Sequence, residues 1–270
     1  MTYLSKRAAV LALAITALLI PASSALADTQ AGYEEFSDCP DKAANANISA
    51  CFRIEVIDGS LTLGNKTTPI TDPIVLVESL IAPEGTPVVG SFDGGRQPVP
   101  GGLVGITGLD YLTWLFPLSL LGLEAEAELA GQPTAPLNDP TVLPLKVLLH
   151  NPLLGTSCRI GSTSTPITLN LTPGTTNPPP PNTPISGAYG DITPDPVLTD
   201  VFRFTGFRLV DNAFAVPGAN GCSLIGIGNI NSIINAQVGL PAPAGENTAI
   251  QDVLIGVGAI EAIYPPGGFE

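Results

Sequence analysis

The alternation of apolar and polar residues predicts a chain made mainly of short β-strands. In the strand expected over residues 51–58, Phe52, Ile54 and Val56 share one parity, and Arg53 and Glu55 take the other. This is the pattern of a strand with one buried face. Asp58-Gly59 predicts a tight turn, after which residues 61–63 return as the second arm of a hairpin. The apolar run over residues 73–81 predicts a strand that is buried on both faces.

The clearest alternation lies in residues 121–129. Leucine and alanine occupy one parity, and Glu124, Glu126 and Glu128 occupy the other. Helix propensity points the other way, because Leu, Ala and Glu are good helix formers. A helix would scatter the three carboxylates around its circumference, whereas a strand aligns them, so a strand is expected. Residues 141–150 are the expected antiparallel partner, since turn signals lie between the two segments.

The same reasoning assigns most of the remaining chain. Residues 83–102 are rich in Gly and Pro and are expected to form loops, whereas residues 103–120 stay unassigned because short apolar runs have no diagnostic period. Further elements are expected as strands over 167–172, 200–210 and 248–263, and as a short helix around Ile230–Ile234 followed by a strand before residue 240. Many short strands joined by Gly/Pro turns predict an all-β fold, an antiparallel β-sandwich with long Pro/Gly-rich loops and at most short helices.

Residues 1–27 have the pattern of a secretory signal peptide. Lys6 and Arg7 precede an apolar stretch over residues 8–20, and Ala25-Leu26-Ala27 supplies small residues for cleavage before Asp28. We therefore expect a secreted, extracellular protein without a membrane anchor after cleavage. The only other long apolar stretch, residues 103–123, is interrupted by glycine, aspartate and proline and makes a poor membrane span.

Residues 28–270 are expected to form a single β-sandwich domain, with a possible subdivision near 173–187. Four consecutive prolines at 178–181 favour an extended polyproline II segment. Such a segment fits either a linker between two domains or a rigid crossover between two sheets. A bridge between Cys158 and Cys222 would span it and favours one domain.

Four cysteines, Cys39, Cys51, Cys158 and Cys222, all follow the predicted signal peptide. Four cysteines allow three pairings, and we expect nearest-neighbour pairs, the first with the second and the third with the fourth. A metal site is the weaker alternative, because no C-x2-C spacing occurs and the single histidine, His150, lies eight residues from the third cysteine.

The charge balance excludes some classes of partner. The formal net charge is −14, and it becomes more negative once Lys6 and Arg7 are removed with the signal peptide. Nucleic-acid binding depends on clustered Lys and Arg, so a nucleic-acid partner is not expected. Anionic membrane surfaces are disfavoured for the same reason.

No set of residues in the sequence matches the pattern of a known type of catalytic site. A Ser-His-Asp triad would have to use His150, and no G-x-S-x-G motif occurs. Glu124, Glu126 and Glu128 could supply a glycosidase pair or weak cation ligands, but a solvated acidic face of a strand explains them better. Neither a dinucleotide motif nor a phosphate loop is found, so no cofactor or metal is expected.

Tyr111, Trp114 and Phe116 form one aromatic cluster. Exposed on a sandwich edge, these rings could stack on sugars or bind an apolar partner. A core plug, or a flap that covers a sheet, is the preferred interpretation.

Several long strings of residues form a recognisable set: His150-Asn-Pro-Leu-Leu-Gly-Thr-Ser-Cys158-Arg-Ile-Gly-Ser162, residues 166–172 and 175–185, and Leu209-Val-Asp-Asn-Ala-Phe-Ala-Val-Pro-Gly-Ala-Asn-Gly-Cys222. Together they resemble a group of uncharacterised secreted proteins of high-GC Gram-positive bacteria. The resemblance covers about half of the chain after residue 27, and it implies a bacterial exported protein. The resemblance implies no particular activity, and it identifies no functional residue.

Three hypotheses for function follow. The preferred one is a secreted, non-enzymatic binding or structural module with an extracellular ligand or partner surface that the sequence does not identify. The first alternative is a secreted carbohydrate-active hydrolase that uses paired carboxylates. The second is a carrier of a small apolar ligand between the sheets, with residues 103–120 as a lid and a closed apolar pocket behind Trp114. The sequence does not specify an oligomeric state.

Overall fold

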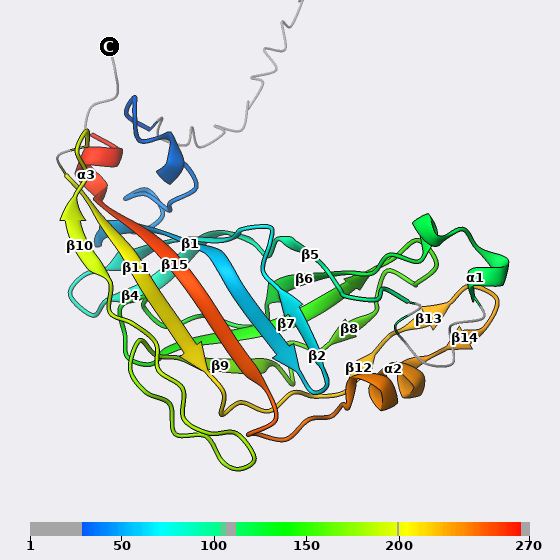
Figure 1. Ribbon diagram of the computed structural model, residues 1–270. Coiled ribbons are helices and arrows are strands. Elements are labelled where there is room, and N and C mark those ends of the chain that lie inside the picture. The colour runs from blue at the N-terminus through cyan, green and yellow to red at the C-terminus, as the bar shows by residue number, and fades with distance from the viewer. Residues whose placement is uncertain (1–28, 104, 106–111, 199, 266–270) are drawn as a thin grey trace, which may run out of the picture.

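The computed structural model describes residues 29–103, 105, 112–198 and 200–265, and they form two antiparallel sheets packed against each other (Figure 1). The expected all-β sandwich is confirmed. The predicted signal peptide and Tyr111 lie outside the described residues, so the signal peptide stays a prediction.

The larger sheet has seven strands in the described part of the chain. Their order is β10-β11-β15-β1-β3-β4, with β2 paired to β1, and every pairing is antiparallel. The strands are β1 (Ile48–Leu63), β2 (Lys66–Pro69), β3 (Ile74–Ile81), β4 (Thr86–Asp93), β10 (Asp191–Pro194), β11 (Val201–Asp211) and β15 (Thr248–Ala259).

The smaller sheet has six strands among the described residues. Their order is β12-β8-β7-β6-β5, with β9 also paired to β7. The strands are β5 (Arg96–Pro98), β6 (Glu124–Leu129), β7 (Thr141–His150), β8 (Arg159–Ile160), β9 (Ile167–Leu171) and β12 (Ala219–Asn220). The expected pairing of β6 with β7 is confirmed, with Glu124 opposite His150 and Leu129 opposite Leu145.

The other elements are short. A small ribbon pairs β13 (Ser223–Leu224) with β14 (Gly228–Asn229). The helices are η1 (Glu34–Phe36), α1 (Leu112–Leu115), η2 (Leu118–Leu120), α2 (Asn231–Val238) and α3 (Ile260–Ile263). The predicted helix around Ile230–Ile234 is confirmed, but the strand expected before residue 240 is wrong because α2 continues to Val238.

The hairpin predicted at Asp58-Gly59 is wrong. Strand β1 runs without interruption through this dipeptide, and its pairing with β15 only shifts register between Val56 and Asp58. Gly59 has a φ of 133°, and a Cβ there would lie 2.0 Å from the carbonyl oxygen of Ile250 on β15. The absence of a side chain at Gly59 therefore allows the backbone of β15 to approach β1 closely at a bulge. The hairpin instead follows Leu63, where Gly64 begins the connection to β2.

The loop expected over residues 83–102 is also wrong in part. It contains β4, which pairs with β3, and β5, which pairs with β6. The prediction took the glycines of this segment as loop residues. Gly90 and Gly94 instead lie in or beside strands, at points where the backbone of another segment approaches closely. A Cβ at Gly94 would lie 1.8 Å from the carbonyl oxygen of Ala127.

The main hydrophobic core lies between the two sheets. Inward side chains of β1, such as Phe52 and Val56, belong to the same buried cluster as Leu145 and Val147 of β7. Each such aliphatic or aromatic side chain contributes roughly 1.5–3 kcal/mol when it leaves water. The strand alternation detected in the sequence therefore marks the faces that hold the sheets together.

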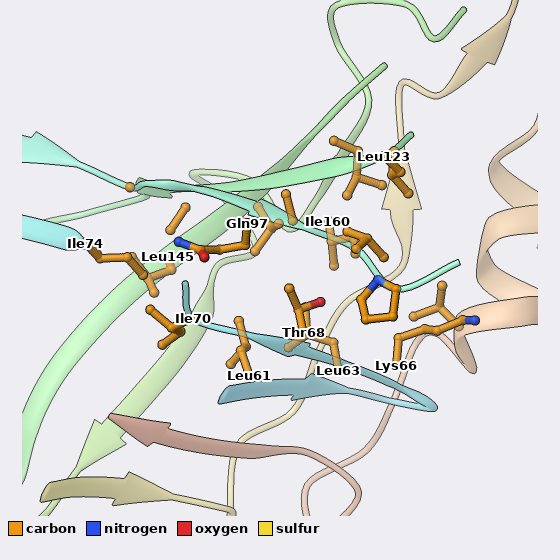
Figure 2. A pocket seen from close by; sticks show the side chains of 18 of the residues that line it. Leu61, Leu63, Lys66, Thr68, Ile70, Ile74, Gln97, Leu123, Leu145 and Ile160 are labelled. Carbon is orange, nitrogen blue, oxygen red and sulfur yellow. The ribbon is translucent and has the colours of Figure 1, made fainter. Parts of the chain in front are cut away.

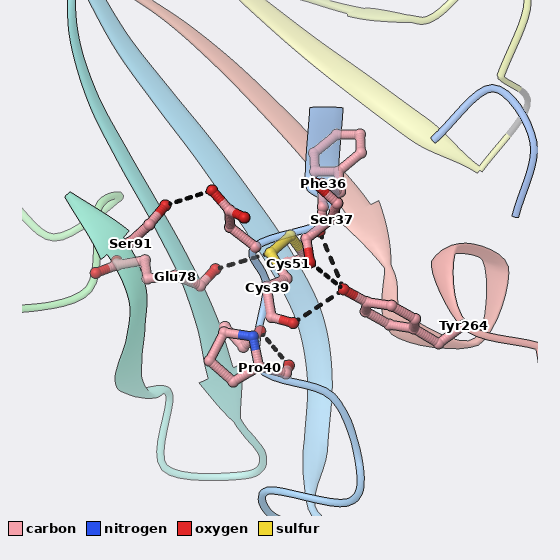
Figure 3. The surroundings of a disulfide bond; sticks show 10 residues. Phe36, Ser37, Cys39, Pro40, Cys51, Glu78, Ser91 and Tyr264 are labelled. Carbon is pink, nitrogen blue, oxygen red and sulfur yellow. Dashed lines mark hydrogen bonds between the residues drawn. A yellow bond between two sulfur atoms is a disulfide. The ribbon is translucent and has the colours of Figure 1, made fainter. Parts of the chain in front are cut away.

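A second core cluster covers the outer face of the larger sheet. The segment that carries η1 lies over β1 and β3 and buries Phe36, Cys39 and Val77. The Cys39–Cys51 disulfide fixes it there, and the hydroxyl of Tyr264 lies 3.0 Å from the carbonyl oxygen of Cys39 (Figure 3). Strand β3 is thus covered on both faces near its middle, as its apolar sequence predicts.

The Cys158–Cys222 disulfide joins the start of β8 to the segment after β12. Both expected disulfides are therefore confirmed, and none of the four cysteines is free. The proline-rich segment between them folds back on itself, since the amide of Thr176 donates to the carbonyl of Ile185. The side-chain amide of Asn182 donates to the carbonyl oxygens of Asn212 and Asn247. The single-domain assignment of residues 28–270 stays a prediction.

Candidate functional site

A partly open apolar pocket lies between the two sheets, and we call it the inter-sheet pocket. It leaves about 100 Å³ for the centres of water-sized molecules. Figure 2 shows Leu61, Leu63 and Thr68 of the β1–β2 hairpin on one side, with Leu123 and Ile160 of the opposite layer facing them. Pockets for small molecules are typically lined by aliphatic side chains with few polar groups.

The sequence builds this pocket from inner-face positions. Ala125 and Ala127 of β6 line it, on the opposite side of the strand from the three glutamates. Their small side chains leave space where larger residues would fill the gap between the sheets. Leu145, Val147 and Leu149 of β7 continue the same wall.

Two polar side chains in the wall of the inter-sheet pocket already have hydrogen-bond partners in the protein. The side chain of Gln97 is buried, with 6% of its surface exposed. Its Oε1 accepts hydrogen bonds from the backbone amides of Thr71 and Asp72, at 2.7 and 3.0 Å. Its Nε2 donates to the backbone carbonyl of Asp72. The ammonium of Lys66 donates to the carbonyl of Gly105 at 3.1 Å. The pocket therefore offers a mainly hydrophobic surface to anything that enters it.

A second, smaller pocket shares Ile74 and Gln251 with the inter-sheet pocket, and we call it the Glu78 pocket. It leaves about 50 Å³ for the centres of water-sized molecules, and it lies between β1, β3 and β15 on one side and β7 and β9 on the other. Glu78 is 0% exposed, and neither carboxylate oxygen has a hydrogen-bond partner among the described protein atoms.

Strand register explains why Glu78 faces inward. Glu78 lies opposite Phe52 of β1, whose ring is in the inter-sheet core, whereas its neighbours Val77 and Ser79 face the outer layer. Figure 3 shows the position of Glu78 beside the Cys39–Cys51 disulfide that closes this outer layer. Burial raises the pKa of the Glu78 carboxyl to about 8, because the charged form loses its hydration.

The three predicted glutamates lie on the outer face of β6 and are paired with cations. Glu128 Oε2 lies 2.9 Å from Lys146 Nζ, and Glu126 Oε2 lies 3.2 Å from Arg96 Nε. Glu124 Oε2 is 3.8 Å from Nη1 of the same arginine. The structure thus brings these carboxylates together along one strand, with basic side chains of β5 and β7 between them.

His150 lies beside the same row of side chains. Its Nε2 is 2.9 Å from Glu126 Oε2, without the geometry of a hydrogen bond. Among the hydrogen bonds of the described residues, none joins this histidine to a serine. Those residues also contain no group of three or more His, Cys, Asp and Glu side chains that could hold a metal ion.

The aromatic cluster is not assembled in the described residues. Trp114 is 93% exposed, so the interpretation of this side chain as a core plug is wrong. The one-turn helix α1 explains this, because Leu112 and Phe116 lie four residues apart and face the core, which directs Trp114 away from it. The inter-sheet pocket is partly open and its lining does not include Trp114, so it is not the closed pocket expected behind this residue, which stays a prediction.

The carrier hypothesis anticipated an apolar pocket between the sheets, but sequence reasoning missed Glu78 and the residues that line the two pockets. The available signal was a single carboxylate inside a run that is otherwise typical of a strand buried on both faces. A charged residue there is either paired or functional.

No helix in the described parts of the chain is long and apolar enough to span a membrane. Comparisons with protein-family models, with curated proteins and with solved structures found no significant match to this chain.

Proposed function

We propose that this protein is an exported, non-enzymatic binding module that holds a slender apolar molecule between its two sheets. The observation that carries the proposal is the inter-sheet pocket, whose wall is formed mainly by aliphatic side chains from both sheets. An apolar cavity of about 150 Å³ accommodates a benzene ring. A pocket of about 100 Å³ that is partly open therefore suits a thin chain or one small ring.

Export is supported by two features of the chain. Residues 1–27 have the pattern of a secretory signal peptide. Both disulfides fit an oxidising compartment, because such bonds rarely persist in the cytosol.

The carbohydrate-hydrolase alternative has less support. The glutamates that could act as acid and base are paired with Arg96 and Lys146 on an outer sheet face rather than facing each other across a pocket. Glycosidases need two carboxyl groups on opposite sides of the scissile bond. Binding alone requires no such pair.

The test is binding of an uncharged one-ring dye, 4-(dimethylamino)benzonitrile, whose fluorescence rises in apolar surroundings, to the chain with both disulfides formed. Ala125→Phe projects a ring into the inter-sheet pocket and is expected to weaken dye binding at least tenfold. Ala125→Val, which is easier to accommodate, is expected to weaken it less. Glu124→Gln is the matched control, because the adjacent side chain points to the opposite face of β6, and it is expected to leave binding unchanged.

Circular dichroism confirms that each variant is folded before dye is added. The proposal is wrong if the wild-type chain does not enhance dye fluorescence. It is equally wrong if folded Ala125→Phe and Ala125→Val bind the dye as tightly as Glu124→Gln does.

A further inference from the structure

Glu78 is a buried acid without a hydrogen-bond partner in the part of the chain that the structure describes. Its side chain is 0% exposed, and both oxygens lack a hydrogen bond within the described residues. The side chain lines a pocket whose other lining residues include no ionisable group. A buried polar group without a partner costs stability. Such a group, aimed into a pocket, is typical of a site that completes its hydrogen bonds with a ligand.

The Glu78 pocket adjoins the inter-sheet pocket. Ile74 and Gln251 belong to the lining of both. The larger of the two spaces is surrounded by aliphatic side chains, and the smaller one contains the carboxyl group. Together they can receive an apolar tail and a small polar head group.

The protonation state of Glu78 selects the chemistry of the head group. No described basic side chain lines its pocket, so nothing there stabilises a carboxylate. Burial favours the neutral acid up to a pH of about 8, the pKa of this carboxyl. A neutral carboxyl has one O–H donor and a carbonyl acceptor. A hydroxyl group also donates once and accepts, so the two groups can satisfy each other.

We propose that the natural ligand is an uncharged alcohol with a slender apolar tail, and that its hydroxyl exchanges hydrogen bonds with the carboxyl of Glu78 while its tail occupies the inter-sheet pocket. This inference rests on the proposed function and names the ligand class for the same site. An anionic head group beside Glu78 is disfavoured because no cation lines the Glu78 pocket, and Lys66 in the lining of the inter-sheet pocket already donates to the carbonyl of Gly105. A purely apolar ligand would leave the acid unsatisfied.

The test compares 1-octanol with nonane, in which a methyl group replaces the hydroxyl, as competitors of the one-ring dye 4-(dimethylamino)benzonitrile. The measured quantity is the ratio of their affinities in each variant. In Glu78→Met the polar group is lost, and the ratio is expected to shift about tenfold toward nonane. In Glu78→Gln the amide still donates and accepts, so the ratio is expected to stay within about threefold of the wild-type value. Glu84→Met, which removes an exposed glutamate in the β3–β4 turn, is the control and should not change the ratio.

The possible results separate this inference from the proposed function. If nonane and 1-octanol both displace the dye but Glu78→Met leaves their ratio unchanged, the role of Glu78 is wrong and the pocket still binds apolar molecules. If 1-octylamine binds more tightly than 1-octanol at pH 7, the ligand class is wrong. If neither competitor displaces the dye from the wild-type chain, the proposed function fails and this inference fails with it.

Discussion

Replacing Glu78 by glutamine is expected to remove a loss of stability that the wild-type protein undergoes between pH 5 and pH 9. The carboxyl is buried between the sheets, and its pKa rises from an ordinary value of 4.5 to about 8. Between these two values the folded chain keeps the proton, whereas the unfolded chain releases it. The unfolded state then binds fewer protons, so the free energy of unfolding falls as the pH rises.

The magnitude follows from the two pKa values. Each pKa unit corresponds to about 1.36 kcal/mol, so the full change is on the order of 5 kcal/mol once the pH exceeds about 8. Total stabilities of domains are roughly 5–15 kcal/mol. The wild-type protein should therefore lose a large share of its stability above pH 8, while the amide variant, which cannot ionise, should not.

Urea unfolding with intact disulfides measures this effect. The free energy of unfolding is determined from pH 5 to pH 9 for the wild-type chain, for Glu78→Gln and for the exposed control Glu84→Gln. Other titrating groups cancel in the difference between wild type and variant. We expect Glu78→Gln to match the wild type near pH 5 and to be several kcal/mol more stable at pH 9. Parallel pH profiles for the two proteins would refute the assignment of a buried, unpaired acid.

Three further predictions concern the fold. Removing the Cys158–Cys222 disulfide by a double alanine substitution should lower stability by about 4 kcal/mol, because the bridge links residues 64 apart; a cost below 1 kcal/mol in urea unfolding would contradict this. Gly59→Ala should cost about 3 kcal/mol, since the new Cβ meets a carbonyl oxygen of β15, whereas Gly85→Ala, with nothing within 4 Å, should cost about 1 kcal/mol; equal costs would argue against the bulge. Fluorescence of Trp114, the single tryptophan, should show the emission and acrylamide quenching of a water-exposed indole, and a blue-shifted, unquenched spectrum would restore the core-plug interpretation.

Local periodicity was sufficient to predict strands whose two faces differ in polarity. The alternation of Glu124, Glu126 and Glu128 with alanine and leucine identified β6 against helix propensity, because one face packs on the core and the other meets water. The nearest-neighbour cysteine pairing, which was the expected one of three possible pairings, also matches the structure.

Tertiary contacts decided the features that the sequence did not predict. Gly59 has the local signature of a turn, but its lack of a side chain serves the approach of β15, which is almost two hundred residues away along the chain. The carrier hypothesis anticipated an apolar pocket, but its lining could not be predicted, because the strand order determines which small residues face each other. Ala125 borders a space only because the β1–β2 hairpin lies opposite to it.

Nuclear Overhauser effects between bound 1-octanol and the methyl groups of the protein test the central claim most directly. We expect contacts from the alkyl chain to Leu61, Leu145 and Val147, which line the inter-sheet pocket. Leu118 and Val197, which are 73% and 81% exposed, serve as controls and should show none. Contacts confined to these exposed side chains, or no contacts at saturating alcohol, would contradict a binding site between the sheets.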